Sequence, residues 1–228
     1  NNVVVKQLLS FLKQNYLFVL VFVLLLFFSI HSFNSIGQDI GRHLKVGEII
    51  WQTKDIPNTN LFSFTEPTFS FINHHWLSEV ILFGIFKFSG FVGLILVKTI
   101  LILSAFLLLF FSIKKQTKLW PILTSFLLSV FIFIERTEVR PEIFSFVILA
   151  FFLFALLKSK YSNTHRYLWF LPLAQILWVN LHIYFFIGPL LVFFFLIDQL
   201  VSKKKTNPKS EILNPKQCLN SNNSNTKL

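Results

Sequence analysis

The sequence predicts an all-α protein whose helices form a transmembrane bundle, with about six membrane spans and one helix lying in the membrane interface. Hydrophobic residues make up 54% of the 228 residues and charged residues only 14%, whereas soluble domains are about 45–50% apolar and about 25% charged. The apolar residues also fall in long blocks, and a spanning helix needs about 17–25 mostly apolar residues. A water-soluble fold would leave most of these blocks exposed to water.

Six of the blocks are assigned as spans and a seventh is assigned to the interface. The spans are expected at residues 16–33, 91–113, 119–134, 143–157, 168–181 and 183–201. Residues 76–88 are too short to cross a bilayer comfortably, and Trp76 and Glu79 within them suit the headgroup region. Several spans are short, so tilted packing or a locally thinned bilayer is expected. Residues 1–201 thus form the predicted membrane domain, which includes a long polar outer loop at 34–75.

The charge pattern predicts which end of each span faces the cytoplasm. Basic residues cluster before the first predicted span and after the second, fourth and sixth. The clusters are Lys6 and Lys13; Lys114, Lys115 and Lys118; Lys158, Lys160 and Arg166; and Lys203, Lys204 and Lys205. Since cytoplasmic loops are enriched in Lys and Arg, these clusters and both termini are expected on the cytoplasmic face of a bacterial membrane. The net charge of +11 is therefore assigned to a membrane surface, and no nucleic-acid partner is predicted.

Residues 202–228 differ in composition from the spans. They are rich in Lys, Asn, Ser and Pro and have no hydrophobic period, which predicts a disordered, basic cytoplasmic tail. The single cysteine, Cys218, excludes an internal disulfide and a cysteine-rich metal site. The absence of methionine predicts a fragment, a processed product or an incomplete gene model. The sequence gives no prediction of oligomeric state.

Acids, histidines and arginines gather on the predicted outer face, where three separate loops contribute them. These residues are Asp39, His43, His74, His75, Glu79, Glu135, Arg136, Glu138, Arg140, Glu142, Asn180 and His182. Loops are polar in most proteins simply because they meet water, and this is the commoner reason for any single residue. The meeting of three such loops nevertheless predicts a binding or catalytic site at the membrane surface.

The segment 135–142 is more highly charged than a simple turn needs to be, because it carries five charges in eight residues. Glu135 and Glu138 share a face of a helical turn, and two carboxylates there could hold Mg²⁺ or Mn²⁺ through oxygen. Arg136 and Arg140 are four residues apart and could bind a phosphate through paired hydrogen bonds. The alternative is that these charges pair with one another and bind no ligand.

Lys98 is the one charged residue well inside a predicted span. Charged residues at membrane depth usually face a cavity or a partner, so Lys98 could neutralise a lipid phosphate. The alternative is that its side chain extends to the outer headgroups. The histidines do not have the spacing of a zinc site, so zinc is not predicted. No glycine-rich phosphate loop, nucleophile elbow or HExxH motif is present.

Several of these residues lie in a series of short motifs that resembles a known family. The series is Asp39-Ile40-Gly41-Arg42-His43-Leu44-Lys45-Val46-Gly47-Glu48, Ile56-Pro57, Phe62-Ser63, His75-Trp76-Leu77-Ser78-Glu79, Arg140-Pro141, Phe144-Ser145 and Trp178-Val179-Asn180-Leu181-His182. Over residues 8–200 the chain resembles the N-terminal half of bacterial membrane glycosyltransferases of the GT-C type. Enzymes of this type use sugars carried on a polyprenyl phosphate.

The resemblance implies a GT-C-like helix bundle and sugar transfer from a polyprenyl-phosphate donor at the outer membrane face. It implies that Asp39 is the catalytic base or a metal ligand, and that Glu135 and Glu138 are ligands if a divalent cation is needed. The residues then expected to bind donor phosphate or substrate are His43, Lys98, Arg136, Arg140 and His182.

The sequence departs from the family pattern in two ways. The family often has two adjacent acids in the first loop, whereas Asp39 stands between Gln38 and Ile40. The usual chain also has more spans and often a soluble C-terminal domain. This chain is therefore expected to be the N-terminal portion of a longer enzyme.

A non-enzymatic multi-pass membrane protein is the alternative, such as a transporter or a lipid-binding assembly subunit. A transporter would be expected to have broken helices near the membrane midplane, often in repeated halves. Pro121, Pro172 and Pro189 could each mark a break, but the sequence contains no evident duplication. The polar residues also gather at one face and not at the midplane, which favours the enzyme.

Overall fold

A computed structural model describes residues 5–6, 16–31, 39–114, 118–135 and 138–206 of the chain. The predicted all-helical class is confirmed for these residues. The helices are α2 (Tyr16–His31), α3 (Ile40–Thr53), α4 (Trp76–Ile113), α5 (Leu119–Glu135), α6 (Glu142–Ser162), α7 (Leu171–Leu181) and α8 (Ile187–Thr206), with two 3₁₀ helices, η2 (Arg166–Phe170) and η3 (Ile183–Phe186). The chain divides into two compact units, Asn1–Pro189 and Leu190–Leu228. The candidate site lies entirely in the first unit.

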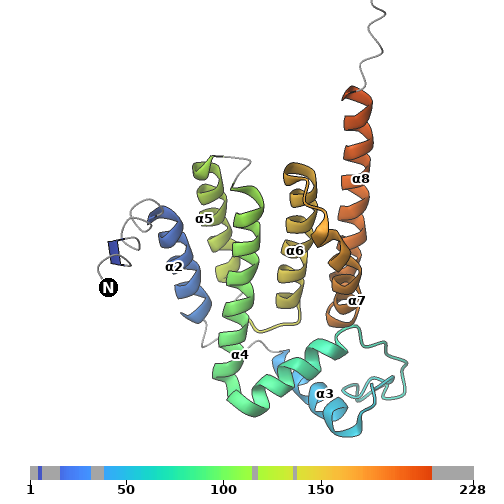
Figure 1. Ribbon diagram of the computed structural model, residues 1–228. Helices are drawn as coiled ribbons and strands as arrows, with labels where there is room; N and C mark the ends of the chain where they lie inside the picture. The colour runs from blue at the N-terminus through green and yellow to red at the C-terminus, as the bar shows by residue number, and fades with distance from the viewer. Residues whose placement is uncertain (1–4, 7–15, 32–38, 115–117, 136–137, 207–228) are drawn as a thin grey trace, which may run out of the picture. The chain divides into compact units, whose positions relative to one another are not determined.

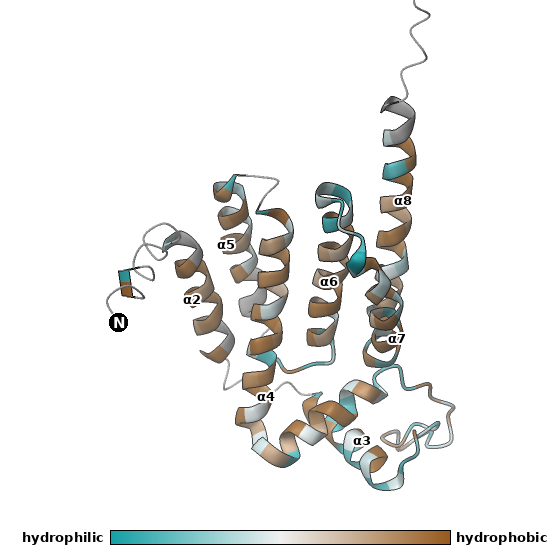
Figure 2. Cartoon of the chain, viewed as in Figure 1, coloured by the Kyte–Doolittle hydropathy of each residue, from teal (hydrophilic) through white to brown (hydrophobic). Residues whose placement is uncertain are grey.

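Among the described residues, three helices are long and apolar enough to cross a membrane, which indicates a membrane protein. They are Trp76–Ile113, Glu142–Ser162 and Ile183–Ser202. The 16 residues of α2 and the 11 residues of α7 rise only about 24 and 16 Å at about 1.5 Å per residue, against a hydrocarbon core of about 30 Å. Length and composition thus support three of the six expected spans. Figure 2 shows hydrophobic residues along α4, α5 and α6, with hydrophilic residues at their ends.

Side-by-side packing of apolar helices forms the core of the first unit. One buried cluster joins α2, the second half of α4 and α5, and its members include Leu25, Phe106 and Ile122. Hydroxyl groups on these helices donate to backbone carbonyls four residues earlier, as Ser104 and Ser112 do at 2.7 and 2.6 Å. Such bonds satisfy polar side chains where no water can, so a serine in these helices costs little in an apolar environment.

The predicted break between residues 76–88 and 91–113 is confirmed inside α4. The backbone is helical on both sides of the break, but Gly90 has φ 61° and ψ −156°. Glycine adopts this left-handed φ without a steric penalty, because it has no Cβ. The first part of α4 consequently lies across the ends of the upright helices, together with α3, while the second part runs alongside α5 and α6 (Figure 1).

The expected polar loop at 34–75 contains a helix, α3, so the loop prediction is wrong for residues 40–53. The buried positions of α3 include Ile40, His43, Leu44 and Gly47, a spacing of three and four residues that marks one helical face. This face packs against the first part of α4. Charged side chains are interleaved with the apolar ones along α3. The segment therefore has a polar composition, which masks the helical spacing of its apolar residues in the sequence.

At the end of the described chain one expected boundary is met and one differs. The predicted fifth span, 168–181, consists of the end of η2 and all of α7, and the chain turns at His182, whose backbone is extended (φ −162°, ψ 149°). Helix α8 continues to Thr206, so residues 202–206, which were expected in the disordered tail, are helical. Residues 207–228 lie outside the described part of the chain.

Close contact between the α3 and α4 backbones at Gly47 gives a test of this packing. A Cβ atom at Gly47 would lie 2.2 Å from the backbone oxygen of Glu79, whereas one at Gly41 meets nothing within 4 Å. We expect Gly47→Ala to destabilise the fold by about 1–3 kcal/mol through overpacking. Gly41→Ala, on the same helix, should leave stability unchanged or raise it. Thermal unfolding of the detergent-solubilised chain measures both, and equal midpoints for the two variants would contradict the packing.

Candidate functional site

A buried hydrogen bond between two side chains joins α3 to the start of α4. The Nδ1 atom of His43 lies 2.8 Å from Oε1 of Glu79, and the two side chains are only 5% and 2% exposed. The Nδ2 group of Asn73 donates to the other carboxylate oxygen, Oε2, at 2.6 Å. Both oxygens of Glu79 therefore have a hydrogen-bond partner, which is the condition under which a buried carboxylate is tolerated.

Local backbone geometry explains why Glu79 sits there. It lies in the first turn of α4, where the helix dipole favours a negative charge. The Oδ1 atom of Asn73 accepts a hydrogen bond from the backbone N–H of His75 at 2.9 Å, an Asx turn that brings the chain into the helix. One side chain, Asn73, thus both starts the helix and holds its carboxylate.

A second buried group surrounds His182, at the junction of α7 and η3. The Oγ atom of Ser145, on α6, lies 2.9 Å from Nδ1 of His182, and Trp178 Nε1 donates to the same Oγ at 2.8 Å. Because an indole N–H only donates, the serine oxygen accepts the bond from Trp178, and the same hydroxyl group is hydrogen-bonded to Nδ1 of His182. Burial, with smaller contributions from His75 and His43, lowers the pKa of His182 to about 4. His182 is therefore neutral at pH 7.

His75 connects the two groups. Its ring centroid lies 5.9 Å from that of His43 and 5.2 Å from that of His182. Burial, and next the neighbouring His43, lower the pKa of His75. Three imidazoles from three separate segments therefore form a row, and two of them are held toward the neutral form, which limits charge repulsion along it.

An acid and an arginine meet one helical turn along α3 from His43. Asp39 occupies the N-cap position of α3, and its backbone carbonyl accepts the N–H of His43 at 3.1 Å. Its carboxylate is half-exposed and lies 3.8 Å from the guanidinium of Arg140. The same guanidinium is paired with Glu138, to which Arg140 Nε donates at 2.6 Å. The first loop and the α5–α6 connection thus meet at Asp39 and Arg140.

Not all of the sequence-predicted site residues join this cluster. Asp39 contacts Arg140, and one helical turn along α3 His43 begins the row that reaches His182, so the three predicted segments do meet. Lys98 is buried, with 1% of its surface exposed, in the second half of α4. It lies beyond the Gly90 kink from the cluster, and its side chain does not extend to the surface.

The predicted metal ligands fall partly outside the described residues. Glu135 ends α5 but its side chain is not described, and Arg136 lies outside the described range. Glu138 pairs with Arg140, as the ion-pair alternative for this segment expects. In the described part of the chain, no group of three or more His, Cys, Asp or Glu residues is arranged to hold a metal ion. A divalent cation stays a prediction.

For several residues that build the cluster, the sequence predicted no specific role. These are Asn73, His75, Glu79, Ser145 and Trp178. All but Asn73 stand in the motifs that carry the family resemblance, as does Asn180, whose Oδ1 accepts a hydrogen bond from Trp76 Nε1 at 2.9 Å. Trp178 and Ser145 are 33 residues apart in sequence, and Trp76 and Asn180 are 104 apart. The motifs could have drawn attention to these residues, but the pairing could not be inferred from them.

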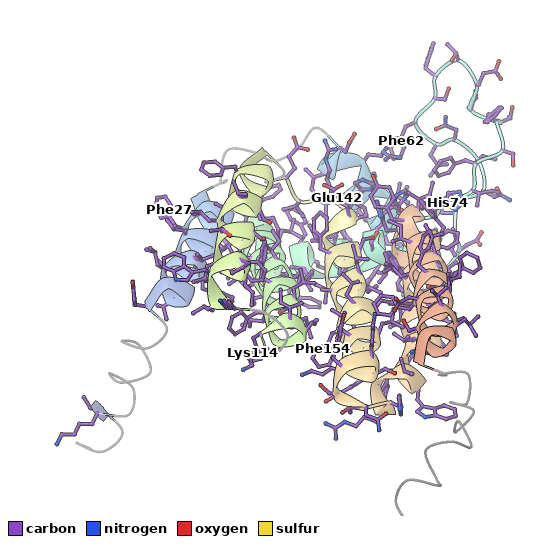
Figure 3. All side chains as sticks on the ribbon, turned by 90° about the horizontal axis from the view of Figure 1, so that it is seen from above. Phe27, Phe62, His74, Lys114, Glu142 and Phe154 are labelled. Carbon is purple, nitrogen blue, oxygen red and sulfur yellow. The ribbon has the colours of Figure 1, made fainter. Side chains whose placement is uncertain are left out.

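Polar and lysine-rich regions lie at opposite ends of the upright helices. Figure 3 places His74 and Glu142 toward one end and Lys114 and Phe154 toward the other. The C-terminal ends of α4 and α6 lie on the same side in Figure 1, away from α3. The candidate site therefore occupies the end opposite to Lys114.

The cluster combines groups suited to proton transfer and anion binding. In a neutral imidazole whose Nδ1–H is held by Glu79, the Nε2 atom of His43 accepts a proton, which is the arrangement of a carboxylate-oriented base. The half-exposed carboxylate of Asp39 is a second proton acceptor. The guanidinium of Arg140 supplies a fixed positive charge with several N–H donors.

Comparisons of the chain with protein-family models, with curated proteins and with solved structures find no match. The function therefore has to be argued from the motifs and from the geometry of this cluster.

Because His182 is neutral in the folded chain, we predict that the stability of the fold depends on pH. The unfolded histidine titrates near pH 6.5, so between pH 6.5 and about 4 the unfolded chain binds a proton that the folded chain does not. We expect the unfolding temperature to fall as the pH is lowered from 7 to 5. His182→Gln should reduce this fall, with His75 retaining part of it, while the exposed control His165→Gln should not. Equal pH slopes for wild type and His182→Gln would contradict the burial of a neutral imidazole.

Proposed function

We propose that this chain is a membrane glycosyltransferase-like protein of the GT-C type that transfers a sugar from a polyprenyl-phosphate donor at the outer membrane face. One observation carries the proposal: residues that the motifs single out come from three distant segments and lie close together. Asp39 contacts Arg140, and one helical turn along α3 His43 begins the row that reaches His182. A base and a fixed cation at the end of apolar helices suit a substrate with a lipid tail and a charged head.

The proposed transfer needs two things from the protein. An acceptor hydroxyl loses its proton as its oxygen bonds to the anomeric carbon of the sugar, and the bond from that carbon to the phosphate oxygen breaks. Asp39 takes the proton, because its carboxylate is half-exposed at the edge of the cluster. Arg140 binds the departing phosphate, because its guanidinium has five N–H donors and only part of them face Glu138.

We further propose a multi-pass arrangement in a bacterial cytoplasmic membrane, with about six spans, both termini in the cytoplasm and the cluster outside. The separation of Lys114 from the cluster along the helices supports it, since basic residues favour the cytoplasmic side. Three helices support it by length and composition. The shorter helices would cross with local thinning of the bilayer.

Replacement of Asp39 tests the proposed mechanism. We expect Asp39→Asn to lower sugar transfer or donor cleavage about 10²–10⁴-fold, because a general base contributes about that factor. The full chain in proteoliposomes would be given polyprenyl-phosphate glucose and polyprenyl-phosphate mannose, and released polyprenyl phosphate would be measured. Parallel reactions with EDTA, and with Mg²⁺ or Mn²⁺ restored, test the predicted cation.

Asp55→Asn is the matched control, because Asp55 is an exposed acid of the same loop region whose carboxylate bonds only the N–H of Ile56 in the structure. The Asp55→Asn variant should cleave the donor at the same rate as the wild type. Undiminished cleavage by Asp39→Asn would remove Asp39 from the mechanism. Absence of cleavage by the wild type with both donors would favour the non-enzymatic alternative, a transporter or a lipid-binding subunit.

Cysteine accessibility tests the proposed orientation separately. The chain would carry Cys218→Ser and then a single cysteine at Asp39, Glu138 or His182, with Lys114→Cys as the control for the other face. We expect a membrane-impermeant maleimide applied to intact cells to label the first two sites strongly, His182 weakly because it is buried, and Lys114→Cys only after lysis. Labelling of Lys114→Cys in intact cells would place the cluster on the cytoplasmic side.

A further inference from the structure

An open apolar groove of about 600 Å³ lies in the elbow of α4. Its walls come from both parts of the kinked helix and from α3, with Trp51, Ile81 and Phe88 on one side of the Gly90 kink and Val92 and Leu96 on the other. The volume falls in the range of ligand-binding clefts, about 300–1,000 Å³. None of the cluster residues His43, Glu79 or His182 lines it.

Two glycines keep this groove open. A Cβ at Gly84 would approach the Trp51 ring to 3.3 Å, and a Cβ at Gly93 would lie 2.3 Å from Cβ of Ser89. Side chains at these positions would therefore narrow the groove or push its walls apart.

An exposed apolar stripe continues from the groove along α4. Val92, Leu96 and Ile100 follow the Gly90 kink and are all exposed in the first unit, and their spacing of four residues places them on one face of the helix. They belong to a helix that is long and apolar enough to cross a membrane. A hydrocarbon chain lying in the groove would therefore continue along a surface that faces lipid.

Positive charge lies at the α3 side of the groove. The ammonium groups of Lys54 and Lys87 stand over the Trp51 ring, 5.4 and 5.5 Å from its centroid. Neither lysine forms an ion pair with a residue that the structure describes. The nearest acid on α3, Glu48, is already paired with Lys45 at 2.8 Å.

Lysines that flank a tryptophan at the end of an apolar surface have the chemistry of a lipid headgroup site. Tryptophan concentrates at membrane–water interfaces, and basic residues there attract anionic lipids. We propose that the elbow of α4 binds a glycerophospholipid with an anionic headgroup, one acyl chain lying in the groove and the headgroup phosphate between Lys54 and Lys87.

This site is separate from the proposed sugar-transfer site. Lys54 follows Asp39 by 15 residues of α3 and its cap, a rise of about 22 Å at about 1.5 Å per residue. A phosphate held by Lys54 and Lys87 is thus out of reach of a base at Asp39. The lipid is therefore not the sugar donor, and its binding does not depend on the proposed enzymatic function.

Native mass spectrometry of the full chain, titrated with phosphatidylglycerol and phosphatidylcholine, tests the proposal. We expect the wild type to prefer phosphatidylglycerol. The Lys54→Gln variant should bind phosphatidylglycerol about fivefold more weakly than the wild type. The double variant, with Lys54→Gln and Lys87→Gln, should bind it about thirtyfold more weakly, since each lysine contributes a similar electrostatic factor. The affinity for phosphatidylcholine should change little. Gly84→Leu, which fills the groove, should weaken the binding of both lipids.

Lys158→Gln is the matched control, because Lys158 also stacks on an aromatic ring, that of Phe154 at 5.6 Å, but on α6 and away from the groove. It should bind both lipids like the wild type. Equal affinity of the wild type for the two lipids, or an unchanged preference in the double variant, would overturn the proposal. Tighter, lysine-dependent binding of polyprenyl phosphate than of phosphatidylglycerol would also overturn it, by assigning the groove to an isoprenoid lipid.

Discussion

The buried carboxylate of Glu79 is the constraint on which the rest of the outer end of the molecule depends. A carboxylate with almost no exposed surface is tolerated only when its oxygens are hydrogen-bonded, and here His43 and Asn73 supply those bonds. The two partners come from α3 and from the loop before α4, so satisfying one charge fixes both segments against the helix. Gly47 makes the arrangement sterically feasible, since only a residue without a side chain lets the α3 backbone approach that of Glu79.

The Gly90 kink gives the membrane-crossing part of α4 and its amphipathic first part different directions. The second part can pack along α5 and α6 as an apolar helix, while the first part lies with α3 across their ends. Two surfaces result from this single bend. One carries the row of histidines with Asp39 and Arg140 at its edge, and the other is the apolar elbow beside Trp51.

Local sequence patterns predicted much of the architecture because the features concerned are local. The helical class follows from long apolar blocks, the break in α4 from a glycine between two such blocks, and the turn at His182 from a polar pair between apolar runs. Helix α3 could in principle have been predicted from the sequence, because its buried residues recur every three or four positions. It was hidden by its polar composition, which resembles that of a loop more than that of a spanning helix.

Composition and motif by themselves determined that this is a helical membrane protein with acids, histidines and arginines gathered in three connecting segments. Only the tertiary structure decided which of them touch. His43 meets Glu79 across 36 residues and Ser145 meets His182 across 37, while Glu138 pairs with Arg140. The physical reason is that such pairs depend on how α3 docks on α4 and α7 on α6. That docking is set by packing of whole helix faces, which no local pattern encodes.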